Sequence, residues 1–416
     1  MKIALSALGT RGDVQPMLAL GLALRRRGHA VRMCAPPDFQ DRVIDVGLPF
    51  CPVGHDVHEM MTVTCRDVVR KPLAPMRVMD EMIRLQFDDL LKACEGADVL
   101  VGAGIQAAAP SIAAALEIPY LYTAYCPVVL RSRQHPAPLV ANQQLSGATN
   151  LLSWWACERF FDFALLSSLN RERRKLGLGE IRRIYDHLFK SRPTLLATDP
   201  ILVPAPADAR DDVVVTGFWY FEDEAELEPL DADLLAFLAA GAPPVYVGFG
   251  SMPSEDPERL TRQIVAAVKA SGQRAILHRG WAGLGDMDLP EEIFLVGSVS
   301  HPKLFPRVAA VVHHGGAGTT ANALRAGVPQ VVVPHILDQF YWADHVRQLG
   351  VGLAAPAMRK LDPARLGRAI RTAAQSAGLR DRARETAVQV DVRSGLERAV
   401  AAIERSEAQP SEVSEP

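Results

Sequence analysis

The sequence predicts an α/β protein built from two doubly wound parallel β-sheets. Short apolar strands alternate with amphipathic helices along most of the chain, as βα units do in a parallel sheet. The 416 residues exceed the usual length of one domain. A segment rich in Pro, Ala and Asp at 199–212, followed by an acidic run at 222–228, separates two series of such units. We therefore expect domains at 1–205 and 206–404, and a disordered Ser-, Glu- and Pro-rich tail at 405–416.

The first series opens with an apolar strand at 2–5 and an amphipathic helix at 16–27 that Gly28 ends. Its other strands are expected at 31–34, 98–101, 120–122 and 194–197. The second series contains strands expected at 213–215, 245–249, 275–277, 294–296, 310–312 and 330–333. Ligands of open parallel sheets bind at the carboxyl ends of the strands, so functional residues are expected in the loops that follow strands.

Residues 99–116 carry no charge over the length of a membrane-spanning helix. Gly102, Gly104 and Pro110 interrupt this run, and most of its apolar residues are alanine. The pattern therefore predicts a strand, a glycine turn and a helix rather than a membrane span.

The charge balance excludes partners that need a strong basic field. Lys and Arg total 45 against 48 Asp and Glu, a net charge of −3, which gives no general attraction for nucleic acid or an anionic membrane. The six cysteines form no CxxC pair, which is typical of free thiols in a reducing cytosol. The apolar run at the start stops at Arg11, which is too short for a signal peptide, so none is expected. We expect a cytoplasmic protein without stable membrane insertion; the sequence does not indicate its oligomeric state.

The strongest local motif is the turn His-His-Gly-Gly-Ala-Gly-Thr-Thr at 313–320, which joins an apolar strand to a helix. Glycines let backbone N–H groups approach an oxyanion, and a helix N-terminus adds partial positive charge. The turn therefore suits a phosphate, although a tight connection without a ligand has the same pattern. Gly316, Gly318 and Ala321 also match the dinucleotide fingerprint G-x-G-x-x-A, with an acidic residue twenty positions beyond Gly318. A NAD-dependent oxidoreductase is thus an alternative, which the late position of the motif and its two histidines disfavour.

Three further loops of the second series are expected at the same edge. A Gly-Phe-Gly-Ser loop at 248–251 offers a second phosphate or sugar contact. Trp281 could stack on a nucleobase, although a buried core residue is the commoner fate of an indole. Asp338 and Gln339 offer acceptors and donors for neighbouring sugar hydroxyls.

These motifs, in this order, resemble the donor half of the GT-B glycosyltransferases of family 1. In the first half, Gly-Thr-Arg-Gly-Asp-Val-Gln-Pro at 9–16 resembles the opening loop of glycopeptide-antibiotic glycosyltransferases and sterol glucosyltransferases. Two further segments, Met-Cys-Ala-Pro-Pro at 33–37 and Tyr-Cys-Pro at 125–127, resemble segments of glycopeptide-type and related natural-product enzymes. The resemblance implies two facing Rossmann-like domains with a cleft between them, and a last helix that packs back on the first domain.

The resemblance also implies roles for individual residues. Asp13 would be the catalytic base, Trp281 would stack on the donor base, and Val299 would pair with that base through its backbone. Asp338 and Gln339 would read the sugar hydroxyls. The residues implied to hold the diphosphate are Thr10, Arg11, Ser251, His314, Gly316, Ala317, Gly318 and Thr319.

The implied reaction is an inverting, metal-independent transfer of a hexose from a UDP- or dTDP-sugar, with no other cofactor, to a hydroxyl of a lipophilic aglycone. Asp13 could instead be only a helix N-cap, and the histidine base of plant relatives is absent from its turn. A methionine-rich segment at 60–82 and residues 131–155 are candidate aglycone contacts or ordinary core. A glycopeptide, polyketide or aromatic acceptor from antibiotic biosynthesis is expected, and a sterol is the alternative. A sugar-nucleotide epimerase and a non-catalytic partner protein remain alternatives from other classes.

Overall fold

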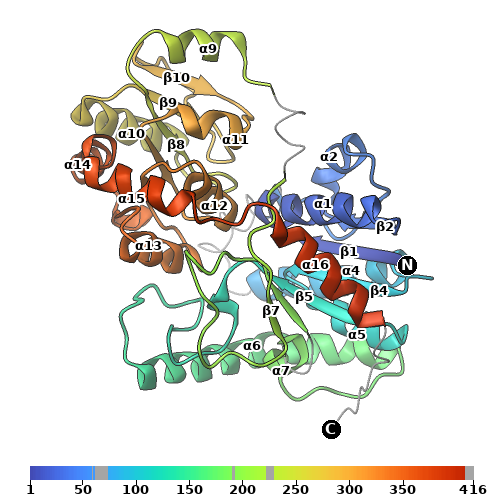
Figure 1. Cartoon of the computed structure of the whole chain (residues 1–416). Helices are drawn as coiled ribbons and strands as arrows, with labels where there is room; N and C mark the ends of the chain where they lie inside the picture. Colours follow the sequence, from blue (N-terminus) through green and yellow to red (C-terminus); the bar gives the residue numbers. More distant parts are fainter. Residues whose placement is uncertain (59, 61–73, 190–192, 222–228, 408–416) are drawn as a thin grey trace.

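The computed structural model describes residues 1–58, 60, 74–189, 193–221 and 229–407. It contains two parallel sheets, of seven strands in the order β3-β2-β1-β4-β5-β6-β7 and of six strands in the order β10-β9-β8-β11-β12-β13. The two sheets with their helices form two bodies that meet at the centre of the molecule (Figure 1). The prediction of two doubly wound parallel sheets is confirmed.

The strands of the first sheet are β1 Lys2–Leu8, β2 Ala30–Ala35, β3 Phe50–Pro52, β4 Val99–Gly104, β5 Tyr120–Ala124, β6 Thr194–Leu196 and β7 Val213–Val215. Its helices are α1 Arg11–Arg26, α2 Gln40–Asp45, α4 Ala74–Ala93, α5 Ala109–Ala115, α6 Gly147–Lys175 and α7 Ile184–Phe189, with 3-10 turns η1 Pro37–Phe39 and η2 Pro127–Val129. The uncharged run at 99–116 forms β4, a turn and α5, as predicted. No described helix is long and apolar enough to cross a membrane.

The strands of the second sheet are β8 Val245–Gly248, β9 Ala275–His278, β10 Ile293–Val296, β11 Ala310–His313, β12 Gln330–Val332 and β13 Gly352–Ala354. Its helices are α9 Ala232–Ala239, α10 Pro257–Ser271, α11 His301–Leu304, α12 Ala317–Arg325, α13 Gln339–Gln348, α14 Pro363–Gln375 and α15 Ala377–Ala387, with 3-10 turns η3 Phe305–Arg307 and η4 Met358–Lys360. The last helix of the chain is α16 Ser394–Glu407.

One strand was assigned to the wrong sheet from the sequence. The apolar run 213–215 was expected to open the second series, but β7 pairs in parallel with β6, Thr194 opposite Val213, at the edge of the first sheet. The chain therefore leaves the first sheet only after Val215. The division of domains at residue 205 stays a prediction.

Helix α1 begins five residues earlier than predicted, at Arg11. Thr10 is its N-cap: the Thr10 hydroxyl accepts a hydrogen bond from Gly12 N at 3.3 Å, and Asp13 Oδ2 accepts one from Thr10 N at 2.8 Å. This reciprocal capping box starts the helix, and Pro16 lies inside it. Asp13 is thus the third helical residue rather than the N-cap.

The last helix, α16, packs against α1 of the first domain and lies beside it in Figure 1. Ala399, Val400 and Ile403 join the core cluster of the first sheet, while Glu404 accepts from Arg27 at 3.1 Å. Because α16 continues to Glu407, residues 405–407 are helical and not part of a disordered tail. The rest of the expected tail, 408–416, lies outside the described residues.

A second contact between the domains is an apolar cluster. Cys126 and Val128, which follow β5, share it with Tyr341 and Trp342 on α13. The apolar cluster and the packing of α16 hold the two domains together. Residues that follow strands of both sheets meet at this junction, as Arg11 and Ser298 do.

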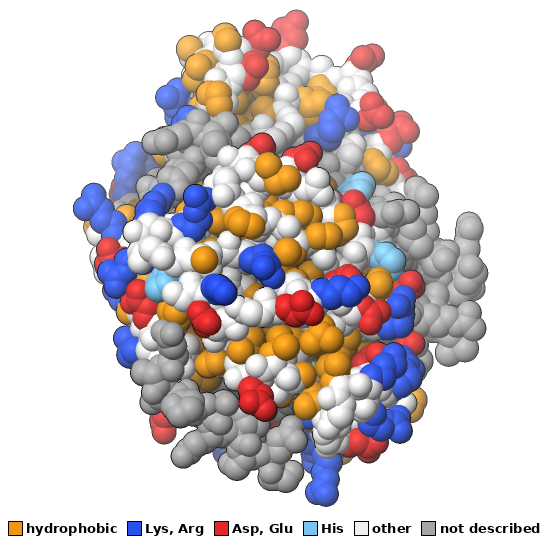
Figure 2. Space-filling model, turned by 90° about the vertical axis from the view of Figure 1, so that its right-hand side faces the viewer, with side chains coloured by type: hydrophobic (Ala, Val, Ile, Leu, Met, Phe, Trp, Pro, Cys, Tyr) orange, Lys and Arg blue, Asp and Glu red, His pale blue; other side chains and the backbone are white. Residues whose placement is uncertain are grey.

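Acidic and basic side chains are interspersed on the face that Figure 2 shows, in keeping with the near-zero net charge.

Candidate active site

Asp13 lies in the first turn of α1, directly after β1, where backbone and glycines confine its carboxylate. Oδ2 accepts the N–H of Thr10, and a Cβ added at Gly9 would lie only 2.1 Å from that oxygen. A Cβ at Gly104, the last residue of β4, would lie 3.1 Å from Oδ1 and 2.2 Å from the Leu8 carbonyl oxygen. The hydroxyl of Tyr125 donates to the Asp13 carbonyl at 3.1 Å. This half-buried carboxylate is therefore fixed in position from several sides.

Burial raises the pKa of Asp13 to about 7, against the lowering effect of the Thr10 hydrogen bonds. The charge of Asp338, from the second domain, raises it further. Burial also raises the pKa of Asp338 to about 6, although Trp342 Nε1 donates to its Oδ2 at 3.1 Å. Two carboxylates from opposite domains therefore share one poorly solvated region, and Asp13 changes its charge near neutral pH.

The glycine turn connects β11 to α12 with Gly316 as N-cap. Gly316 offers no side-chain hydrogen bond, so the N–H groups of Ala317, Gly318 and Thr319 have no acceptor within the helix. A Cβ added at Gly318 would meet no atom within 4 Å, which shows open space beside the turn. This arrangement can receive an anion through backbone N–H groups at the positive end of the helix dipole.

The two histidines before the glycines have different surroundings. His313 is fully buried: its Nε2 lies 2.9 Å from Gln330 Oε1, and its Nδ1 accepts from Gly315 N at 3.1 Å. The ring of His314 fits between two loops, because added Cβ atoms at Gly250 and Gly316 would lie 2.9 and 2.5 Å from it. His313 thus supports the turn, whereas His314 lies where the two glycine loops meet.

His314 is held neutral in this position. Burial, and then the neighbouring His313 and His335, keep the pKa of His314 well below its usual value. Its Nδ1 is buried and has no hydrogen-bond partner among the described residues. A neutral imidazole beside an anion site can donate one N–H, and the negative charge of a bound diphosphate would favour its protonated form.

Ser251 lies in the loop after β8 and Trp281 in the loop after β9, and a backbone hydrogen bond at Gly250 connects the two loops. The N–H of Trp281 donates to the Gly250 carbonyl at 3.0 Å. A Cβ at Gly280 would lie 2.7 Å from the same oxygen, so only glycine fits in that left-handed position (φ +53°). Trp281 is half-buried, and its ring is in contact with His58 of the first domain.

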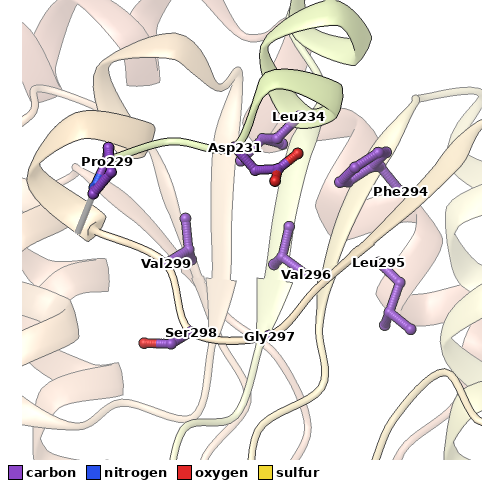
Figure 3. A pocket seen from close by; sticks show the side chains of 9 residues that line it. All are labelled: Pro229, Asp231, Leu234, Phe294, Leu295, Val296, Gly297, Ser298 and Val299. Atoms are coloured by element: carbon purple, nitrogen blue, oxygen red, sulfur yellow. The ribbon is translucent and has the colours of Figure 1, made fainter.

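Val299 lies in the loop after β10 and is buried. It lines a cavity of about 350 Å³ whose other walls come from residues 229–234 and from β10 with its loop (Figure 3). Arg11 reaches across from the first domain to this loop, with its Nη1 3.5 Å from Ser298 Oγ, while its Nε donates to Gln15 at 2.9 Å.

Gln339 is more constrained than the sequence indicates. Its Oε1 accepts the N–H groups of His335 at 2.7 Å and Ile336 at 3.1 Å, and its Nε2 lies 3.3 Å from Met252 Sδ. The amide oxygen therefore shapes the loop that carries Asp338. Leu337, just before Asp338, adopts a left-handed φ of +49°, a strained conformation for leucine that fixes this loop.

The structure thus brings most of the expected residues to one junction: Thr10, Arg11 and Asp13 from one domain, and residues after β8, β9, β10, β11 and β12 from the other. Gly104, Tyr125 and His58 also lie there but were not expected. A glycine that closes an apolar run was the available signal for Gly104; His58 carries no motif that points to a nucleotide.

The two expected aglycone segments are described only in part. Residues 61–73 of the methionine-rich segment lie outside the described residues. Trp154 is core, with its Nε1 donating to the His135 carbonyl at 3.2 Å, whereas Trp155 is 60% exposed. Among the described residues, no three His, Cys, Asp or Glu side chains are grouped as metal ligands.

Comparisons with known proteins bear on this arrangement. The glycosyltransferase family 28 N-terminal domain matches residues 3–132, and the erythromycin biosynthesis protein CIII-like C-terminal domain matches residues 263–394. Glycosyltransferase GtfE of Amycolatopsis orientalis is 40% identical over 360 residues, 85% of this chain and 86% of that protein. This chain belongs to the same glycosyltransferase family. Its glycine turn is therefore part of a glycosyltransferase and not of a NAD-dependent oxidoreductase.

Further relatives agree. Vancomycin aglycone glucosyltransferase of Amycolatopsis orientalis is 39% identical over 363 residues, with 85% of this chain and 86% of that protein covered. A sterol 3-beta-glucosyltransferase of Arabidopsis thaliana is 34% identical over 394 residues, which span 89% of this glycosyltransferase but 62% of the plant protein.

Solved structures show the same GT-B fold. The glycotransferase of kitacinnamycin matches with a TM-score of 0.72 and 21% identity over 97% of this chain and 98% of its own. Glycosyltransferase VinC, solved with dTDP, matches with a TM-score of 0.68 and 19% identity over 98% and 100%. The predicted GT-B fold is confirmed.

Proposed function

We propose that this glycosyltransferase moves a hexose from a dTDP- or UDP-linked donor to a hydroxyl group of a lipophilic natural-product aglycone, with inversion at the anomeric carbon. The observation that carries the proposal is the position of Asp13. Its carboxylate has a pKa raised to about 7 and is influenced by the charge of Asp338 from the opposite domain, and α1, which carries it, packs against α12. A base and an anion site on opposite sides of one junction suit a direct displacement.

The donor side would neutralise the leaving diphosphate. The N–H groups of Ala317, Gly318 and Thr319, together with His314 and Ser251, would contact its oxygens, and Thr10 and Arg11 would approach from the other domain. Trp281 and the backbone of Val299 would hold the base. Because these donors are fixed before the reaction, they stabilise the developing charge without reorganisation.

On the acceptor side, Asp13 would accept the proton of the hydroxyl as the new bond to C1 forms and the bond from C1 to the diphosphate oxygen breaks. A carboxylate with an ordinary pKa is a weak base toward an alcohol. A pKa near 7 makes Asp13 a stronger base and still leaves about half of the molecules ionised at pH 7. Asp338 would accept from a sugar hydroxyl and orient C1 toward Asp13. A single displacement of this kind inverts the anomeric configuration.

The relatives support the substrate classes. One is named as a vancomycin aglycone glucosyltransferase and another as a dTDP-epi-vancosaminyltransferase, and VinC was solved with dTDP. These names favour an antibiotic-type acceptor and a dTDP- or UDP-linked sugar as co-substrate. The more distant sterol relative keeps a sterol as the alternative acceptor.

The test has two stages. Thermal melting against dTDP, UDP, GDP and NAD identifies the nucleotide, since a ligand that binds only the folded chain raises the midpoint. Transfer from the matching dTDP- or UDP-glucose is then measured by mass spectrometry with a glycopeptide aglycone, a macrolide, a polyaromatic phenol and a sterol. Glycoside formation with an antibiotic-type acceptor is expected. Stabilisation by NAD alone, or transfer to the sterol alone, would contradict the proposal.

A further inference from the structure

The loop region expected to hold the donor base is contacted by a side chain of the first domain, His58. The rings of His58 and Trp281 lie 5.0 Å apart, centre to centre, at an interplanar angle of 77°. This is the edge-to-face geometry of a favourable aromatic pair. Arg11 makes a second crossing contact nearby, to Ser298 beside Val299. Both halves of the expected base site are thus approached from the acceptor domain.

His58 is presented by an anchored piece of backbone. The carboxylate of Asp38, in the turn after β2, accepts the N–H of Val57 at 3.3 Å and also that of His58. Burial raises the pKa of Asp38, and these hydrogen bonds oppose the rise. The His58 side chain itself is exposed, so it is not needed to fill the core of its own domain.

Trp281 is anchored equally well on the other side. Its N–H is bound to the Gly250 carbonyl, and Gly280 fixes the sharp turn before it. The two rings in contact are thus carried by backbone segments that hydrogen bonds hold in place on opposite domains. A planar group stacked on Trp281 would lie beside the imidazole of His58.

We propose that His58 is a positioning residue for the donor nucleotide: together with Trp281 it contacts the base, so that both domains bind one nucleotide. This rests on the proposed function, in which Trp281 stacks on the base. An imidazole edge against a base or indole contributes about as much as other aromatic pairs, equivalent to roughly 3- to 10-fold in affinity. The acceptor domain would then take part in donor binding. A bound nucleotide would in turn help to hold the two domains in a fixed relative position.

The test compares three variants of the full chain. His58→Ala removes the ring, His58→Phe keeps an aromatic edge, and His55→Ala is the matched control, because His55 is an exposed histidine of the same segment that pairs with Glu81 at 3.3 Å. For each, calorimetry gives the Kd of dTDP and UDP, and steady-state kinetics give kcat and the KM values of donor and acceptor. Thermal melting without ligand checks that folding is unchanged.

We expect His58→Ala to raise the nucleotide Kd and the donor KM by about 3- to 10-fold, with kcat and the acceptor KM changed less than twofold. His58→Phe should restore most of the affinity, and His55→Ala should match the unsubstituted chain. An unchanged or lower Kd in His58→Ala, an equal loss in His55→Ala, or no recovery in His58→Phe would overturn the inference. If the unsubstituted chain bound neither dTDP nor UDP, the proposed function itself would fail.

Discussion

Replacing Gly104 with alanine tests whether the position of the Asp13 carboxylate controls the reaction. Gly104 has a φ of +78°, and an added Cβ would lie 2.2 Å from the Leu8 carbonyl oxygen and 3.1 Å from Asp13 Oδ1. The substitution therefore adds left-handed strain, about 1 kcal/mol, and a collision that must move the end of β1 or the carboxylate, about 1–3 kcal/mol. A displacement of about 1 Å in a reacting group can lower a rate by about 100-fold.

Gly96→Ala is the matched control. Gly96 precedes the same strand and has a similar φ of +69°, but a Cβ there meets no atom within 4 Å. It should lose only the strain, about 1 kcal/mol, and keep its kcat. We expect Gly104→Ala to lose about 2–4 kcal/mol of stability in denaturant unfolding and about 100-fold in kcat, with nucleotide affinity retained. A Gly104→Ala enzyme with the kcat of Gly96→Ala would show that the position of the Asp13 carboxylate does not control the reaction.

Three other predictions concern titration and reactivity. Transfer at saturating donor should rise with pH to a plateau, with its midpoint near the pKa of about 7 of Asp13, because only the carboxylate accepts the proton; a flat profile between pH 5.5 and 8.5 would contradict this. His314→Ala should weaken dTDP or UDP binding by about 10- to 100-fold in calorimetry, the effect of one hydrogen bond to a charged group. An unchanged Kd would show that the ring only fills space between the two loops. A hydrogen bond from Cys34 lowers the pKa of Cys51 to about 6, whereas burial raises that of Cys94 to about 12. Iodoacetamide at pH 7 should therefore label Cys51 faster than Cys94, as peptide mass spectrometry would show, and faster labelling of Cys94 would oppose it.

Most strands could be predicted because a parallel sheet covered on both faces needs nearly continuous apolar runs. The run 213–215 shows the limit of this signal. Its three valines predict a strand but not its neighbour, since the pairing with β6 depends on contacts that are remote in sequence. Strand β3 could not be predicted, because it has only three residues, Phe50–Pro52, and ends in proline, so it shows no strand pattern.

The site shows the same division between local and distant information. The glycine turn and Asp13 carry local motifs, so their place after strands could be predicted. The separate fates of His313 and His314 could not, because they depend on Gln330 and on the Gly250 loop. The contact of His58 with Trp281 joins the two domains, and no periodicity reports it.

The most direct test of the account is Asp13→Asn, measured for both nucleotide binding and transfer. Asparagine keeps an oxygen that can accept the Thr10 N–H, so α1 should retain its cap while the base is lost. We expect a dTDP or UDP Kd within about threefold of the unsubstituted chain and a fall in kcat of about 100- to 10,000-fold. Turnover comparable to that of the unsubstituted chain, with intact nucleotide binding, would show that Asp13 is not the base.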